Sequence, residues 1–379
     1  MKFRVERESL ADAVAWTAKS LPARPPVPVL AGVLLDASND RLTVSGFDYE
    51  VSSQMGVDVQ TESSGRVLVS GRLLAEITRA LPNHPVQLEV DGARAEITCG
   101  TARFTLPTMP VEDYPALPEM PTVAGAVDAD EFAAAVAQVV VAAGRDDTLP
   151  VLTGVRVELE GDKVTMLATD RYRLALRELT WRPGTADVSQ HALVPARTLA
   201  DTAKAMVSGK EVTIALSQGR VGEGLIGFSG AGRRTTTRLL DGEFPKVRSL
   251  FPDTHAAQAK VPTAAMIEVV KRVALVAERN TPVRLGFADN MLTVEAGGSE
   301  DARASESMDA QYDGEDLQIA FNPQFLLDGL GALGADTAVL SFTAPAKPAV
   351  LTGEASDSES APVAENTYRY LLMPVRVSS

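Results

Sequence analysis

A long internal repeat constrains the fold of this chain more than any other feature of its sequence. The segment PVLAGVLLDASNDRLTVSGFD, which begins at Pro28, aligns without a gap with PVLTGVRVELEGDKVTMLATD, found 122 residues further on (150 − 28). At this offset Gly32 falls on Gly154 and Asp48 falls on Asp170. Chance similarity rarely preserves proline, glycine and aspartate at one offset, so we expect duplicated structural units.

A third copy follows, with weaker similarity. VRLGFADNMLTV, from Val283, aligns with VLLDASNDRLTV, from Val33, at an offset of 250 residues (283 − 33). Each copy then has a strand that leads into a helix, at VSGRLLAEITRAL, VPARTLADTAKAM and FNPQFLLDGLGAL. We expect the first helix of the chain to begin near Ser9 as its N-cap. The pattern predicts an α+β fold in three tandem domains of normal size, which are 1–122, 123–256 and 257–379.

The composition indicates a folded, cytoplasmic protein. Apolar residues make up 45% of the 379 residues, which is enough to form large cores. The single cysteine, Cys99, excludes an intrachain disulfide and is expected to be a packing residue. Charges interrupt the N-terminal MKFRVERESL, unlike a signal peptide, and no apolar run reaches the roughly eighteen residues of a membrane span. The net charge of −14 argues against binding to nucleic acid.

The sequence lacks the motifs of common active sites. It has no G-x-x-x-x-G-K-[ST] loop, and no lysine follows the glycine-rich GEGLIGFSGAG, so we expect a hairpin loop there. The three histidines, His84, His191 and His255, do not have the spacing of metal ligands. Two repeated acids, Asp48 and Asp170, invite an acid/base hypothesis, but their equivalence by duplication favours a structural role in turns. We therefore expect no enzymatic activity, no cofactor and no metal.

Five motifs spread along the chain are more specific than the repeat itself. They are TDRYRLA, the PVL…GV opening of the repeats, GEFPKVRSLFP, FNPQFLLDGL and the terminal YRYLLMPVR. With them, essentially the whole chain resembles the DNA polymerase III beta subunits, the bacterial beta sliding clamps. The resemblance implies three DNA-clamp domains per chain and a head-to-tail homodimeric ring, with helices lining the hole and sheets outside. It further implies a clamp that encircles duplex DNA and confers processivity on the replicative polymerase.

The resemblance also implies a cleft between the second and third domains. Such a cleft binds short peptide motifs of the replicative polymerase, the clamp loader and repair polymerases. Apolar walls, the adaptable Met373 and the rigid Pro374 suit an extended peptide, and Arg173 and Arg376 are expected to hold its polar groups from the rim. The alternative is that LLMPV is simply the last core strand. The residues carried over to the cleft are Leu152, Thr169, Tyr172, Arg173, Leu174, Pro245, Asn322, Phe325, Val350, Leu371, Leu372, Met373, Pro374, Val375 and Arg376.

Basic side chains on or beside the predicted helices could explain how a chain with a negative net charge binds DNA. A mildly basic hole within an acidic rim would make weak, salt-sensitive phosphate contacts without base readout, which suits a ring held topologically. The alternative is that these cations only solvate exposed helix faces. The residues expected to face DNA are Arg24, Arg72, Arg79, Arg145, Arg197, Lys204, Lys271 and Arg272.

A contact between the first and third domains would close the ring. We expect Phe104 and Leu106 to meet Ala274 and Leu275 of another chain, and the alternative for each is ordinary core burial. Two other classes of protein stay open at this level. One is an enzyme with its active site between repeats, which would need a cluster of acids with perturbed pKa values or a cofactor pocket. The other is a ligand-binding or scaffold protein without a DNA role, which the negative charge supports.

Overall fold

The chain folds into two compact units, each with its own sheets. The computed structural model describes residues 1–217, 224–278, 281–297, 302–354 and 367–376. The middle copy of the repeat is shared between the units. The first unit comprises Met1–Asp130, Arg182–Ala186 and Asp201–Leu239, and the second comprises Glu131–Trp181, Asp187–Ala200 and Leu240–Ser379.

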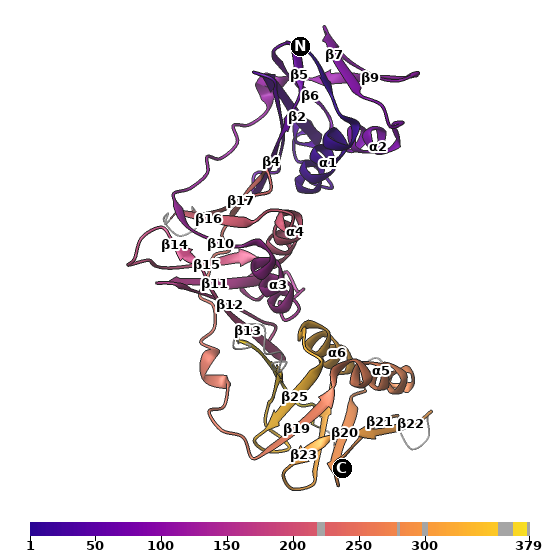
Figure 1. Ribbon diagram of the computed structural model, residues 1–379, viewed down its shortest axis with the longest axis vertical. Coiled ribbons are helices and arrows are strands. Elements are labelled where there is room, and N and C mark those ends of the chain that lie inside the picture. Colours follow the sequence, from indigo (N-terminus) through magenta and orange to yellow (C-terminus); the bar gives the residue numbers. More distant parts are fainter. Residues whose placement is uncertain (218–223, 279–280, 298–301, 355–366, 377–379) are drawn as a thin grey trace. The chain divides into compact units, whose positions relative to one another are not determined.

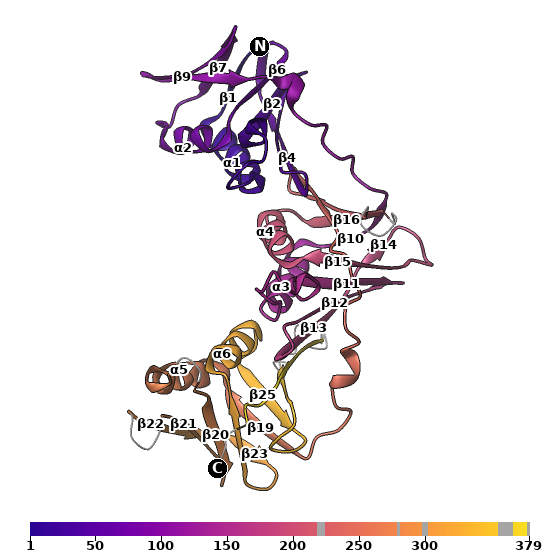
Figure 2. The same ribbon diagram turned by 180° about the vertical axis from the view of Figure 1, so that it is seen from behind.

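The first unit is built on an antiparallel sheet of 14 strands, in the order β14-β10-β16-β17-β18-β4-β3-β2-β6-β9-β8-β7-β1-β5 (Figures 1 and 2). Exposed and buried residues alternate along β8, which is typical of a sheet with one covered face. The strands are β1 (Lys2–Val5), β2 (Gly32–Ser38), β3 (Arg41–Phe47), β4 (Val51–Asp58), β5 (Gln60–Ser63), β6 (Gly65–Ser70), β7 (Val86–Asp91), β8 (Arg94–Cys99), β9 (Ala102–Met109), β10 (Val123–Asp128), β14 (Arg182–Pro183), β16 (Glu211–Ser217), β17 (Leu225–Gly230) and β18 (Arg233–Arg238).

Two helices cover one face of the first copy's part of this sheet. Helices α1 (Arg7–Thr17) and α2 (Gly71–Ala80) lie side by side (Figures 1 and 2). The prediction that Ser9 caps α1 is wrong: the helix begins at Arg7, and its N-cap is Glu6, which makes no side-chain capping hydrogen bond. The predicted apolar stripe is present, because Leu10 and its helical neighbours are fully buried. Three short 3-10 helices connect the strands: η1 (Ala18–Ser20), η2 (Pro28–Ala31) and η3 (Val111–Asp113).

A strand ladder joins the first copy to the middle copy within this unit. Strand β18 pairs antiparallel with β4, so that Arg233 lies opposite Met55. Between the two strands, Ser52 Oγ and Thr236 Oγ1 are hydrogen bonded at 2.6 Å, although these residues are 184 positions apart. The sheet therefore continues across a repeat boundary, which no local sequence pattern predicts.

The second unit has a nine-stranded antiparallel sheet, β15-β11-β12-β13-β27-β26-β25-β19-β23, and a four-stranded sheet, β22-β21-β20-β24. Here the ladder between β13 and β27 joins the middle copy to the third copy, with Arg173 opposite Leu372. The strands are β11 (Gly154–Glu160), β12 (Lys163–Thr169), β13 (Arg173–Thr180), β15 (Ser189–Pro195), β19 (Ala257–Pro262), β20 (Val283–Ala288), β21 (Met291–Ala296), β22 (Ala304–Asp309), β23 (Gln311–Asp313), β24 (Leu317–Phe321), β25 (Thr337–Phe342), β26 (Ala349–Gly353) and β27 (Tyr368–Leu372).

Helices α5 (Thr263–Val273) and α6 (Pro323–Ala332) pack against each other in the third copy (Figure 2). Helices α3 (Ala129–Val140) and α4 (Ala196–Met206) belong to the middle copy, and the division between the units passes through both of them. The domain boundaries expected at 122 and 256 fall immediately before β10 and β19, and they stay predictions. The remaining 3-10 helices are η4 (Pro150–Thr153), η5 (Arg248–Leu250) and η6 (Ala274–Val276).

The repeated aspartates form equivalent turns, as the duplication indicated. Asp48 Oδ1 accepts hydrogen bonds from the backbone N–H groups of Glu50 and Val51, at 2.9 and 2.6 Å. Asp170 Oδ1 accepts from Tyr172 and Arg173 in the same way, at 3.0 and 3.1 Å. In both copies the residue after the aspartate is left-handed, with φ of 75° at Tyr49 and 81° at Arg171. Such side-chain to backbone bonds define a structural turn.

The glycine-rich segment, residues 222–232, is not the loop that its composition predicted. Residues 222 and 223 lie outside the described residues, but Leu225–Gly230 form β17, and only Ala231 and Gly232 form the turn to β18. Both turn residues have positive φ, at 52° and 74°, which matches the twist of a two-residue hairpin.

No helix in the described ranges is long and apolar enough to span a membrane. The same ranges hold no group of three or more His, Cys, Asp or Glu side chains placed to bind a metal ion. Cys99 is buried, and its sulfur lies 3.2 Å from the carbonyl oxygens of Pro82 and His84, either of which can accept the single thiol hydrogen.

Candidate functional site

A hollow of about 420 Å³ lies in the second unit, where the start of β13 meets α6 and the segment that leads into η4. Its volume is in the range of pockets for small ligands or a few peptide residues. Four of the residues predicted for the cleft line it, namely Leu152, Tyr172, Arg173 and Phe325. The other lining residues are Ala143, Gly144, Arg145, Asp146, Leu149, Asp170, Arg171, Gln324 and Asp328.

Arg173 is the centre of a polar network beneath this hollow. Its Nε donates to Asp170 Oδ2 at 2.9 Å, and its Nη1 donates to Asp328 Oδ2 at 2.5 Å. Nη1 also lies 3.5 Å from the hydroxyl of Tyr370, and the guanidinium lies over the ring of Phe325, 4.3 Å from its centroid. The network ties the turn before β13 to helix α6.

The position of Arg173 corrects the prediction that it reaches out from the rim. The residue is only 5% exposed, so its charge is buried and is balanced by two carboxylates. Burial alone would lower the pKa of Arg173, but Tyr370, Asp328 and Asp170 outweigh it and raise the pKa above its ordinary value. The arginine therefore stiffens the floor of the site. Arg376, its expected partner at the rim, is exposed.

Tyr370 connects this network to the backbone of α6. Burial raises the pKa of its hydroxyl, so the group stays protonated and donates to the carbonyl oxygen of Phe325 at 2.8 Å. The contact is close because Gly329 has no side chain: a Cβ there would lie 2.5 Å from the Tyr370 ring. Asp328 and Gly329 both lie in the motif FNPQFLLDGL, but the sequence analysis did not assign either of them to the cleft.

An aromatic lip stands above this floor. The ring of Tyr172 is 55% exposed and stacks on Phe325 at 6.2 Å between centroids. The guanidinium of Arg171 lies over the ring of Tyr172, with its central carbon 5.8 Å from the ring centroid. The strained, left-handed φ of Arg171 turns the chain so that Tyr172 points outward.

The segment that follows β27 supplies exposed apolar side chains beside the lip. Met373 and Val375 are each 38% exposed. Backbone bonds hold them in place, because the N–H of Met373 donates to Tyr172 at 2.9 Å and that of Val375 donates to Ala320 at 2.8 Å. This segment is thus both the end of a core sheet and an exposed apolar edge.

Several other residues predicted for the cleft are buried in an apolar cluster on the nine-stranded sheet. Leu174, Val350 and Leu371 belong to it, and Thr169 and Leu372 are buried nearby. The prediction missed six members of the cluster, and three of them, Phe244, Val247 and Phe251, come from the segment GEFPKVRSLFP. Its apolar spacing was the available signal. Pro245 in this segment is exposed, as is Leu250 at 49%.

Asn322 has a defined structural role at the edge of the site. Its side-chain oxygen caps α6 by accepting from the N–H groups of Gln324 and Phe325, at 2.9 and 3.2 Å. This cap fixes the first turn of the helix, which carries Phe325. The loop before η4 is fixed in a similar way. Asp146 in this loop accepts hydrogen bonds from the backbone N–H and the hydroxyl of Thr148, and these bonds lower the pKa of Asp146.

The eight cations predicted to face DNA are all exposed. Six of them lie on helices: two each on α2, α4 and α5. The pair on α5 is neutralised, since Lys271 contacts Glu268 at 2.9 Å and Arg272 contacts Glu306 at 2.6 Å. Among the described residues, the other six form no ion pair. Arg145 differs from the rest because it lines the hollow.

The residues predicted for a contact between chains differ in exposure. Leu275 is 84% exposed and Phe104 is 37% exposed, which is unusual for large apolar side chains. Leu106 is only 1% exposed and packs in the core of its own unit. Phe104 lies on an open strand edge: among the described residues, Ala102–Leu106 pair only with β8. Strand β22 likewise has β21 as its only described neighbour.

Comparison with known proteins covers nearly the whole chain. The N-terminal, central and C-terminal domain models of the DNA polymerase III beta subunit match residues 1–118, 126–246 and 248–367. A beta sliding clamp of Streptomyces coelicolor is 60% identical over 379 residues, which is 100% of both chains.

Solved structures agree with this match. The DNA polymerase sliding clamp of Bacillus subtilis has a TM-score of 0.89 at 26% identity. A sliding clamp of Pseudomonas aeruginosa bound to griselimycin has a TM-score of 0.90, also at 26% identity. In both cases the similarity covers 100% of each chain.

Proposed function

This chain belongs to the DNA polymerase III beta subunit family, the beta sliding clamps, and we propose that it works as a homodimeric ring around duplex DNA. The family is a processivity factor without catalytic activity. In this role the clamp holds the replicative polymerase on DNA through topology, so it needs neither base readout nor a tight grip. The observation that carries the proposal is the match of all three domain models along one chain.

The hollow beside α6, with the aromatic lip and the exposed C-terminal edge, is the proposed site for partner peptides. Tyr172, Met373 and Val375 offer exposed apolar surface, while the paired charges of Arg173 make the floor rigid and nearly neutral. Such a surface favours a short extended peptide with apolar side chains, held with modest affinity. Modest affinity lets the replicative polymerase, the clamp loader and repair polymerases exchange on one clamp.

The proposed ring has its unpaired cations near DNA. Arg72 and Arg79 on α2, and Arg197 and Lys204 on α4, are exposed and have no ion-pair partner in the described ranges. Their contacts with phosphates would be weak and sensitive to salt, because a few surface cations release few counterions. This arrangement reconciles the net charge of −14 with a DNA-binding role.

The proposed dimer forms head to tail through the two open strand edges, β9 of one chain and β22 of another. Edge strands with unpaired backbone groups readily pair with another chain. Phe104 and Leu275 would lose their exposed apolar surface in this contact, whereas Leu106 would support β9 from inside its own core. We further propose a cytoplasmic location, consistent with a single, buried cysteine.

The function is tested by primer extension on a long single-stranded circle with the cognate polymerase and clamp loader. Adding the protein should lengthen the products made in a single polymerase binding event. A Tyr172→Ala variant should lose most of this effect while remaining folded, because the side chain is mostly exposed. Unchanged product lengths with the wild-type protein would contradict the proposal.

A further inference from the structure

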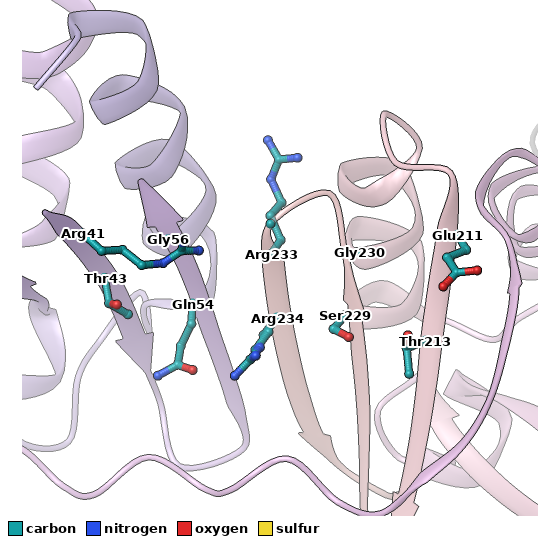
Figure 3. Close-up of a pocket in the computed structure, with 11 residues that line it drawn as sticks. Arg41, Thr43, Gln54, Gly56, Glu211, Thr213, Ser229, Gly230, Arg233 and Arg234 are labelled. Atoms are coloured by element: carbon teal, nitrogen blue, oxygen red, sulfur yellow. The ribbon is translucent and has the colours of Figure 1, made fainter. Parts of the chain in front are cut away.

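A second hollow, of about 440 Å³, lies in the first unit and plays no part in the proposed function (Figure 3). It spans the ladder between β4 and β18 and is on the sheet face opposite α1. Along β4, Met55 and Val57 face the core that α1 covers, so Gln54 and Gly56 face the hollow.

Positive charge in this hollow is only partly compensated. Arg234 is exposed and has no ion-pair partner among the described residues. Within the described parts of the chain, the one ion-pair partner of Arg41 is Asp58, at 3.7 Å, and that carboxylate is 97% exposed, so solvent screens the pair strongly. Both guanidinium groups are therefore available to a ligand.

The other charges at the hollow are already paired. Arg233 donates to Asp12 at 2.5 Å and to the carbonyl oxygen of Ala205 at 2.7 Å, so its guanidinium is engaged on the helix side. Glu211 is paired with Arg182. The net result is an excess of positive charge, on a chain whose net charge is −14.

Gly56 allows Arg41 to lie along the sheet. A Cβ at this position would be 2.2 Å from Arg41 Nη2 and 2.6 Å from its Nε. Figure 3 shows the Arg41 side chain extended from β3 to Gly56 on β4. The guanidinium is thereby held over the backbone at one end of the hollow, an orientation that suits two-point contact with a planar oxyanion.

Short polar side chains form the floor of the hollow on both sides of Arg234. Thr43, Gln54, Ser229 and Thr213 come from four strands of one sheet face and offer both donors and acceptors (Figure 3). Hydroxyl and amide groups of this kind can bind the N–H and C=O groups of an extended peptide. The chemistry of the floor thus complements a peptide backbone, and the arginines complement its acidic side chains.

The lining is less suited to nucleic acid. None of the described residues that line the hollow is aromatic, so there is no surface on which a base can stack. Glu211 at one end is paired with Arg182, but 52% of its side chain is exposed, and this carboxylate disfavours a continuous phosphate backbone there. A short peptide can avoid this carboxylate by placing its acids at the arginines.

We propose that this hollow binds an acidic peptide segment of a partner protein, with carboxylates on Arg41 and Arg234. The site is separate from the cleft beside α6, and its lining lacks exposed aromatic or large apolar side chains such as Tyr172 and Met373, which that cleft offers. A partner could then occupy this site while the apolar cleft holds another peptide motif.

The test uses the full-length wild-type protein and a fluorescein-labelled peptide of alternating aspartate and serine, followed by fluorescence anisotropy. The matched control peptide has asparagine in place of aspartate. The double variant Arg41→Ala, Arg234→Ala should weaken binding of the aspartate peptide by about tenfold, because it removes two charge-assisted contacts. Gly56→Ala should weaken binding by about threefold without any change of charge, since only the flexible end of Arg41 must move.

Two controls make the outcome specific. Arg4→Ala removes an equally exposed cation at the far end of the same sheet and should leave binding unchanged. Tyr172→Ala, in the proposed partner cleft, should also leave it unchanged. The proposal would be overturned by equal binding of both peptides, by full binding to the double variant, or by stronger binding of an oligothymidylate to the same arginines. None of these results depends on DNA loading, so they leave the clamp function untouched.

Discussion

Arg173 Nη1 lies 2.5 Å from Asp328 Oδ2, although the two residues are 155 positions apart in the chain. The pair connects the turn before β13, in the middle copy of the repeat, to α6 in the third copy. Because Arg173 is 5% exposed and Asp328 has 22% of its side chain exposed, the contact is largely desolvated. The floor of the proposed partner site is therefore a joint between two copies.

Replacing Asp328 with asparagine should lower the free energy of unfolding by about 2 kcal/mol, because Arg173 loses one of two balancing carboxylates. Urea unfolding at neutral pH measures this change. The matched control is Asp253→Asn, an exposed aspartate in a loop of the same unit, which should change the free energy by less than about 0.5 kcal/mol. Equal effects of the two substitutions would contradict the role of the joint.

Tyr172→Ala should weaken binding of a labelled polymerase peptide about tenfold, because an exposed aromatic ring in a recess is a typical hot spot. Tyr172→Phe should bind normally, since the ring is needed for stacking on Phe325 and the hydroxyl is not. Fluorescence anisotropy gives both affinities. Loss of binding in the phenylalanine variant would show that the hydroxyl, not the ring, carries recognition.

Leu275→Lys should convert the dimer to a monomer at micromolar concentration. The side chain is 84% exposed in the single chain, and a buried, unpaired charge would oppose its contact with another chain. Sedimentation should show about 80 kDa for the wild type, twice 40.1 kDa, and about half of that for the variant. Met291→Lys, at another exposed apolar residue of the third copy, is the control and should remain a dimer.

Arg197→Ala combined with Lys204→Ala should reduce the salt dependence of weak binding to short duplexes. These cations on α4 are exposed and unpaired among the described residues, so each can release a counterion from DNA. The slope of log K against log salt should fall by up to about 2. The comparison pair is Lys271→Ala with Arg272→Ala, whose charges are held by Glu268 and Glu306 and which should change the slope less. The reverse order would contradict the assignment of the DNA-facing cations.

Glu158 should make the stability of the second unit depend on pH in the acidic range. Burial tends to raise its pKa, but hydrogen bonds from Arg156 and Arg248 outweigh this and lower the pKa below its ordinary value of 4.5. A carboxyl whose pKa is lower in the folded state stabilises the protein above its unfolded pKa, and this contribution is lost as the pH falls through the folded value.

The stability difference between wild type and Glu158→Gln should therefore be largest at neutral pH and should shrink below about pH 4.5. Urea midpoints across this range measure it. Glu160→Gln, an exposed neighbour on the same strand, should show a small difference at every pH. A difference that grows on acidification would reverse the predicted sign.

The sequence predicted the features that repeat or that depend on nearby residues. The offset of 122 placed β2 on β11 and identified Asp48 and Asp170 as equivalent turn residues, because these bonds span only two or three residues.

Contacts between distant segments were beyond reach of the sequence. The burial of Arg173 depends on Asp328, and the glycine-rich segment became a strand because β18 extends the sheet to β4. The sequence also misplaced the start of α1 by two residues. Ser9 is a residue type suited to an N-cap, but the helix begins at Arg7 and Ser9 lies inside it. The sequence likewise did not distinguish Phe104 from Leu106, which are two residues apart on one strand. In the structure Phe104 is exposed and Leu106 is buried in the core.

Retention on circular DNA tests the central claim most directly. The labelled protein is loaded by its clamp loader onto a nicked circle, separated from free protein by gel filtration, and followed before and after a restriction enzyme linearises the DNA. A topological clamp stays with the circle at moderate salt and is released within minutes once free ends exist. Equal retention on circular and linear DNA would mean that the protein grips the duplex directly, and would contradict the ring.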